Sequence, residues 1–139
     1  MEKITAPMRF IAAICIFTGG AMHARGLMCG LESGYDFPLW AWAIFLIAMA
    51  GYTISAIGIL KNIAPAFYFA ALAPMVGGSL IFLGFIFPDS RLIILIPGTF
   101  ENEITLTGFI TLLVEPMAVV LSILCLAMTK VLNNNCPQI

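Results

Sequence analysis

Four long apolar segments follow one another along this chain of 139 residues. They cover residues 9–28, 39–60, 63–87 and 104–128. A helix needs ~20 apolar residues to cross a hydrocarbon core ~30 Å thick, and the last three segments easily meet this length. The first segment is weaker because His23 and Arg25 lie near its end. We therefore expect one domain, residues 1–139, with the fold of an all-α integral membrane protein: a four-transmembrane-helix bundle.

Composition supports the membrane as the solvent for this chain. Hydrophobic residues make up 62% of the sequence and charged residues only 9%, and the mean hydropathy is +1.09. A soluble domain carries roughly a quarter charged residues, enough to cover its surface. The formal net charge of −1 argues against nucleic acid as a partner. The expected partners are lipids and other membrane protein subunits.

Lysine and arginine residues mark one side of the expected bundle. With four spans, four basic residues fall on the side that carries both termini: Lys3, Arg9, Lys61 and Lys130. Because cytoplasmic segments carry an excess of Lys and Arg, we expect both termini on the cytoplasmic (inner) side of a bacterial or organelle inner membrane. The outer loops are then 29–38 and 88–103. In the longer loop, Leu92–Ile96 is too short to span and is expected to lie at the membrane interface.

The first segment also has some features of a signal peptide. Lys3 and Arg9 would form its basic region, and residues 10–18 its short apolar region. No clean small-x-small cleavage site follows. We therefore expect a helix that is retained in the protein.

Small and polar residues recur at alternating spacings of three and four in all four segments, which places them on one face of each helix. In lipid, small residues allow helix backbones to approach closely and so promote helix association. The residues that we expect to pack in this way are Gly19, Gly51, Ser55, Ala73, Gly77 and Gly108.

The motif Val114-Glu115-Pro116 puts an acid in the middle of the fourth segment. Glu115 lies ~16 Å along that span at 1.5 Å per residue, near the bilayer midplane, where an ionised acid is unfavourable unless it is paired. It shares its helix face with Thr111, so it is expected to point into the bundle or toward a partner protein. Pro116 removes a backbone donor and frees the carbonyl of Leu112. Two hypotheses follow: Glu115 is a proton or ligand site, or it is a polar contact that holds an assembly together.

His23 is the only histidine in the chain. Gly19, four residues earlier, leaves room for a flat ring, so His23 is a candidate axial ligand for haem or a chlorin. One histidine cannot supply both axial ligands. The alternatives are an interfacial histidine bonded to a loop carbonyl or to Glu32, and a pairing with Glu115.

Motifs for catalysis are missing from the sequence. It has no GxGxxG, P-loop, HExxH or nucleophile elbow, and its four cysteines form no CxxC. We therefore predict no catalytic residues, no metal site and no enzyme activity of its own. The sequence requires no cofactor, and it leaves contact with lipid, quinone or pigment open.

Two stretches resemble DoxX-like proteins, a family of small four-helix membrane proteins. "RFIAAICIFTGGAMH" is similar to their opening helix, and "AMAGYTISAIGILKNIAP" to their second helix and the tight turn after it. The acid that such families often carry in the second helix is replaced here by Ala48 or Met49. The resemblance implies a small membrane partner of an oxidoreductase and identifies no site residue.

These observations favour two functions. The first is a non-catalytic accessory subunit of a larger membrane complex, in respiration (electron transport) or another energy-converting process. The second is a small oligomeric transporter or channel with Glu115 as its midplane proton or ligand site. An enzyme acting on quinone or lipid would depend on Glu115 and His23 alone.

Overall fold

The computed structural model describes residues 2–32, 34, 36–87, 99–100, 103–104 and 106–135, and this part of the chain is almost entirely helical. Its four helices are α1 (Glu2–Glu32), α2 (Leu39–Leu60), α3 (Ala64–Ile86) and α4 (Leu106–Asn135). Each of them is long and apolar enough to span a membrane. The prediction of an all-α bundle with four candidate spans is therefore confirmed.

The helix bounds differ most from the predicted ones at α1 and α4. The α1 helix begins at Glu2 and runs to Glu32, so it includes the start of the predicted outer loop, and α4 continues to Asn135. The prediction followed apolar length, which measures the part of a helix inside hydrocarbon. Backbone hydrogen bonding does not stop at that boundary, so both helices extend beyond the apolar residues. The predicted interfacial segment Leu92–Ile96 lies outside the described residues.

A short antiparallel strand pair precedes α4. The strands are β1 (Thr99–Phe100) and β2 (Glu103–Ile104), with Thr99 opposite Ile104. The sequence analysis did not predict these strands, because two residues are too few to show the alternation of a β-strand.

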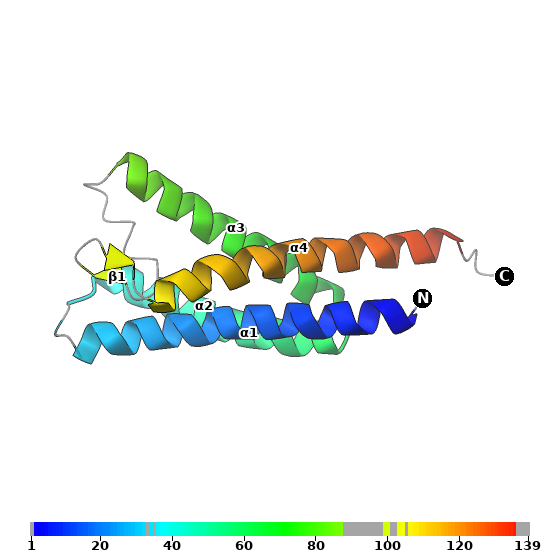
Figure 1. Cartoon of the computed structure of the whole chain (residues 1–139), viewed down its shortest axis with the longest axis horizontal. Coiled ribbons are helices and arrows are strands. Elements are labelled where there is room, and N and C mark those ends of the chain that lie inside the picture. The colour runs from blue at the N-terminus through cyan, green and yellow to red at the C-terminus, as the bar shows by residue number, and fades with distance from the viewer. Residues whose placement is uncertain are drawn as a thin grey trace.

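The helices alternate in direction, so α1 begins and α4 ends at the same end of the bundle (Figure 1). We call this the terminal end. The α3 helix crosses α4 and diverges from the other helices toward the opposite end (Figure 1). The α1 helix packs closely against both α2 and α4. The main contacts of α3 are with α2 and α4.

A tight turn at the terminal end joins α2 to α3. Asn62 adopts the left-handed conformation with φ 58°, which asparagine tolerates better than most residues. The Ile63 N–H donates to the Gly58 carbonyl over 2.8 Å and closes the turn. Pro65 follows in the first turn of α3, where its missing N–H breaks no helical hydrogen bond. These features confine α2 and α3 to an antiparallel hairpin.

Two buried clusters fill the bundle, one on each side of His23. The cluster on the side of the terminal end is built mainly of small and aliphatic side chains: Ala12, Ala13, Cys15, Ile16, Ala56, Ile59, Ala70, Ala118 and Cys125, with the rings of Tyr52 and Phe67. The cluster toward the opposite end contains Leu27, Phe37, Ala41 and Phe45. The first cluster therefore separates the middle of the bundle from the terminal end by a closely packed layer that is mainly apolar and also holds the buried Ser55 and Ser122.

We predict that Gly58→Ala destabilises the α2–α3 hairpin. A Cβ atom at Gly58 would lie 2.5 Å from the Ala66 Cβ, so the two helices would have to separate. Overpacking of this kind costs about 1–3 kcal/mol. The measurement is the free energy of unfolding in mixed micelles, followed by circular dichroism as denaturing detergent is added.

Gly78→Ala is the matched control. A Cβ atom at Gly78 has nothing within 4 Å, so this variant should unfold within about 0.5 kcal/mol of the wild type. Equal effects of the two substitutions would contradict the close approach of α2 and α3 at Gly58.

Candidate functional site

The site begins with two glycines in α1. A Cβ atom at Gly19 would lie 3.3 Å from the Tyr52 ring and 3.4 Å from the Glu115 Cγ. A Cβ atom at Gly20 would lie 3.1 Å from the Tyr52 Cβ. Because these positions carry no side chain, the α1 backbone comes close enough for Tyr52 of α2 and Glu115 of α4 to lie against it. The pair "GG" in the first apolar segment thus brings three helices together at one level.

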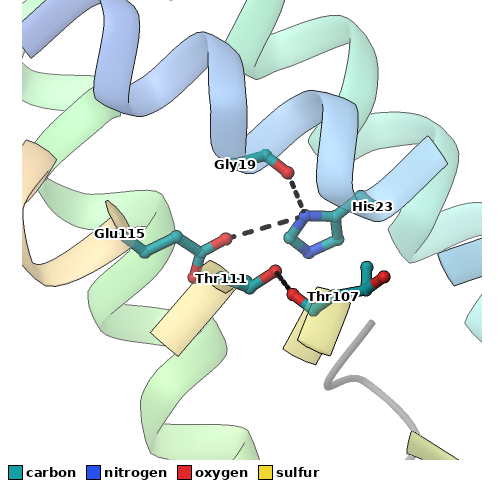
Figure 2. Close-up of polar contacts among 5 residues, drawn as sticks. All are labelled: Gly19, His23, Thr107, Thr111 and Glu115. Atoms are coloured by element: carbon teal, nitrogen blue, oxygen red, sulfur yellow. Dashed lines mark hydrogen bonds and ion pairs between the residues drawn. The ribbon is translucent and has the colours of Figure 1, made fainter. Parts of the chain in front are cut away.

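Glu115 points into the bundle and toward His23 of α1 (Figure 2). Its Oε1 atom lies 3.6 Å from the His23 Nδ1, and the two side chains are 13% and 9% exposed, respectively. This distance allows an ion pair when His23 is protonated, but it is too long for a strong hydrogen bond. Oε1 is buried and has no hydrogen-bond partner among the described residues. One oxygen of the acid therefore retains an unused acceptor position.

The orientation of the His23 ring is set by its own helix. Its Nδ1 lies 2.9 Å from the Gly19 carbonyl oxygen, one turn earlier in α1. A carbonyl only accepts hydrogen bonds, so Nδ1 must carry the proton. The ring also makes edge contacts with Phe45 and Tyr52, at centroid distances of 5.7 and 5.5 Å. In the neutral ring Nε2 is then an acceptor, and it points away from Gly19 (Figure 2).

Two hydroxyl groups complete the polar part of the site. The Tyr52 side chain lies beside Glu115, close to Gly19, and the two side chains line the same cavity. The Thr111 hydroxyl, one turn from Glu115 in α4, donates to the Thr107 carbonyl over 3.0 Å (Figure 2). Pro116 adds a further acceptor, because it lacks the N–H that would otherwise bond the Leu112 carbonyl.

These polar side chains lie at the edge of an apolar cavity of about 420 Å³ between α2, α3 and α4. Its polar lining residues are His23, Tyr52, Thr111 and Glu115, and α3 contributes only apolar residues and glycines: Phe69, Leu72, Ala73, Val76, Gly77, Gly78, Leu80 and Ile81. Ile47 and Val76 line the cavity and are also 65% and 59% exposed, so the cavity reaches the apolar outer surface of the bundle. The volume lies within the range of ~300–1,000 Å³ typical of small-molecule sites.

The structure brings together most of the residues that the sequence analysis singled out. Glu115, Thr111, His23 and Gly19 form the polar cluster, and Ala73 and Gly77 line the cavity. Gly51 faces the Phe69 ring, whereas Ser55 and Gly108 are buried elsewhere. Of the partners considered for His23, the structure places Glu115 near it, at 3.6 Å, while the ring's hydrogen bond goes to the Gly19 carbonyl. No group of three or more potential metal ligands occurs within the described ranges.

Tyr52 is the residue that the sequence analysis missed. A tyrosine inside an apolar segment resembles any other large apolar residue, and aromatic residues are usually read as packing. The one sequence feature that could have indicated its role is the neighbouring Gly51, which leaves room for the Phe69 ring beside Tyr52. The Tyr52 and Phe69 rings then form an edge contact at 6.3 Å.

Comparisons with protein-family models, curated proteins and solved structures gave no match to this chain. The resemblance to DoxX-like proteins therefore stays a prediction. Evidence for function comes from the residues and their geometry.

We predict that His23 and Glu115 are energetically coupled. Replacing either by leucine leaves the other without its partner, whereas the double substitution removes both groups. The double-mutant cycle should give a coupling energy of about 1 kcal/mol or more in the free energy of unfolding. The measurement is detergent unfolding of the four proteins in the same micelles.

Thr53→Val provides the control cycle with Glu115→Leu. Thr53 is exposed, and its hydroxyl donates to the Met49 carbonyl of its own helix. Its effect should add to that of Glu115→Leu within about 0.5 kcal/mol. The same additivity for His23 and Glu115 would show that the two do not interact.

Proposed function

We propose that this chain is a multi-pass membrane protein that binds a small lipid-soluble molecule at Glu115. One observation carries the proposal: polar side chains from three helices meet at the edge of an apolar cavity. Glu115 points into its own bundle rather than outward, which favours a ligand or proton site over a contact with another subunit. The cavity would hold the apolar part of the ligand, and Glu115, His23 and Tyr52 its polar part.

Binding is better supported than passage through the membrane. The closely packed layer of alanine, isoleucine and cysteine residues lies between Glu115 and the terminal end. A channel would need space or a continuous polar path through that layer, and the buried polar side chains that α2 and α4 place there are two serines, Ser55 and Ser122. The cavity instead reaches the apolar outer surface, so we propose that the ligand enters from the lipid.

A role as an accessory subunit is the second candidate. In α4, only 22% of the apolar segment is buried, so most of its surface is open to lipid or to neighbouring subunits. A ligand site in such a subunit would suit a non-catalytic partner of a membrane oxidoreductase, as the resemblance to DoxX-like proteins implies. We propose a respiratory or other energy-converting complex as its setting.

For orientation, we propose that the terminal end faces the cytoplasm or the equivalent inner side. Lys61 lies in the α2–α3 turn at this end, and Arg9 and Lys130 belong to the parts of α1 and α4 nearest to it. The excess of basic residues there follows the rule for cytoplasmic segments. A bacterial or organelle inner membrane fits this arrangement.

We predict that Gly77→Leu abolishes ligand binding by filling the cavity. A Cβ atom at Gly77 meets nothing within 4 Å, so the leucine can extend into the space without disturbing the helices. The probe is a fatty alcohol with a photoreactive diazirine beside its hydroxyl group, added to the protein in lipid nanodiscs. Mass spectrometry should find labelled peptides from α2, α3 and α4 in the wild type, and at least about tenfold less label in Gly77→Leu.

Ser79→Leu is the matched control on the same helix. Ser79 is exposed, its hydroxyl donates to the Met75 carbonyl, and it does not line the cavity. This variant should be labelled like the wild type. Equal labelling of Gly77→Leu, or labelling spread over all lipid-facing residues, would exclude the cavity as a binding site.

For the accessory-subunit candidate, we predict that the chain leaves its native membrane inside a larger hetero-oligomer. Mild detergent extraction should give a particle much heavier than 15.0 kDa, with other chains identified by mass spectrometry. An absorption spectrum of the same particle tests for pigment. A small homo-oligomer without other chains would rule this candidate out and leave the binding function as it stands.

A further inference from the structure

We infer that the ligand of this cavity is a lipophilic amine, bound as an ammonium ion against Glu115. The inference rests on the proposed function, because it names the chemical class that the same cavity takes. It depends on three features of the site: the charge balance of the lining, the unused oxygen of Glu115, and the aromatic rings that line the same cavity.

The charge balance is the first feature. Glu115 is the only acid that lines the cavity, and no lysine or arginine lies among the described lining residues. An ionised carboxylate at this depth is unfavourable without a cation. The groups that face Glu115 and can titrate are His23 of α1 and Tyr52 of α2, whereas the α3 lining contains none. A cationic ligand would supply this positive charge, for which His23 is the alternative source among the described lining residues.

The second feature is the unused oxygen of Glu115, which the nearby His23 does not satisfy. The His23 Nδ1–H is already bonded to the Gly19 carbonyl at 2.9 Å and lies 3.6 Å from the Glu115 Oε1. It therefore does not satisfy this oxygen, which remains buried without a hydrogen bond from the described residues. An ammonium N–H is a strong donor to a carboxylate, because both groups carry charge.

The third feature is the aromatic surface of the cavity. The Tyr52 and Phe69 rings both line the cavity. The face of an aromatic ring attracts a cation, and the attraction strengthens when water is excluded. Apolar side chains make up the rest of the wall, which suits a hydrocarbon body. A carboxyl group, aromatic rings and an apolar wall together favour an amine over a neutral alcohol of equal size.

Proton transfer makes this binding electrically neutral overall. A tertiary amine enters from the lipid without charge, and its nitrogen lone pair takes the proton of the Glu115 carboxylic acid. The O–H bond breaks as the N–H bond forms, which leaves an ammonium ion beside a carboxylate. No charge crosses the membrane surface, so the cost of moving an ion into hydrocarbon is avoided.

The test compares two ligands that differ at one atom. The amine is N,N-dimethyl-4-phenylbutylamine, and its neutral counterpart carries CH in place of the nitrogen. Both are radiolabelled and measured by equilibrium dialysis against the protein in phosphatidylcholine nanodiscs, with empty nanodiscs as the blank. We expect saturable binding of the amine, with an affinity at least about tenfold higher than that of the counterpart.

Glu115→Gln tests the acid itself, because glutamine keeps the size and hydrogen bonding of the side chain but cannot donate a proton or carry a charge. This variant should bind the amine at least about tenfold more weakly and the neutral counterpart unchanged. If the glutamine variant does not fold, the comparison of the two ligands on the wild-type protein still decides the question.

The outcomes test separately whether the ligand is an amine and whether the cavity binds a ligand at all. Equal affinities of the wild type for both ligands, or unchanged amine binding in Glu115→Gln, would overturn the amine while leaving a ligand cavity in place. Binding of neither ligand, together with no effect of Gly77→Leu on photolabelling, would overturn the cavity as a functional site. Amine binding that Gly77→Leu abolishes and Ser79→Leu preserves would support both.

Discussion

The constraint behind this structure is the apolar length of its four helices, each of which could span a membrane, whose interior holds no water. Each backbone N–H and C=O must be satisfied within its own segment, which is why the apolar segments are helices. A polar side chain in such a helix must then find its partner on another helix or on its own backbone. Glu115 lies beside Tyr52 and His23. The helices come this close because Gly19 and Gly20 carry no side chains. The packing of α1 against α2 and α4 and the assembly of the polar site are thus the same set of contacts.

The α3 helix has a different role. It is fixed to α2 by the tight turn at Asn62 and by the approach of Gly58 to Ala66, and it diverges from the other helices beyond them (Figure 1). Gly77 and Gly78 lie along the diverging part and leave space that larger residues would fill. The bundle therefore combines a closely packed half, formed mainly by short side chains, with a half in which a cavity lies beside Glu115, the one acid among its described lining residues. Such a division allows a rigid scaffold and an accessible site to coexist in a short chain.

Much of this architecture could be predicted from the sequence. Apolar length indicated the four helices and matched the bounds of α2, because a helix needs about 20 apolar residues to cross the hydrocarbon core. The spacing of small residues placed Glu115 and Thr111 on one face of their helix, and both side chains are largely buried in the structure. The cavity could not be predicted, because it depends on the angle at which α3 leaves α4, and helix angles arise from the packing of many side chains at once. Tyr52 was missed for a related reason: its importance comes from the two α1 glycines opposite it, which lie in a distant part of the sequence.

The hydrogen bond from His23 to the Gly19 carbonyl has a consequence for how this site can evolve. The acceptor belongs to the main chain, so every amino acid at position 19 would provide it as long as α1 stays helical. Substitutions there change the space available to Tyr52 and Glu115, but they keep the backbone acceptor of the imidazole. Natural variation at position 19 can therefore change the space of the binding site while Nε2 of the neutral ring remains a hydrogen-bond acceptor. The hydrogen-bond acceptor of the histidine is thus part of the helix backbone, and it does not depend on which side chain stands at position 19.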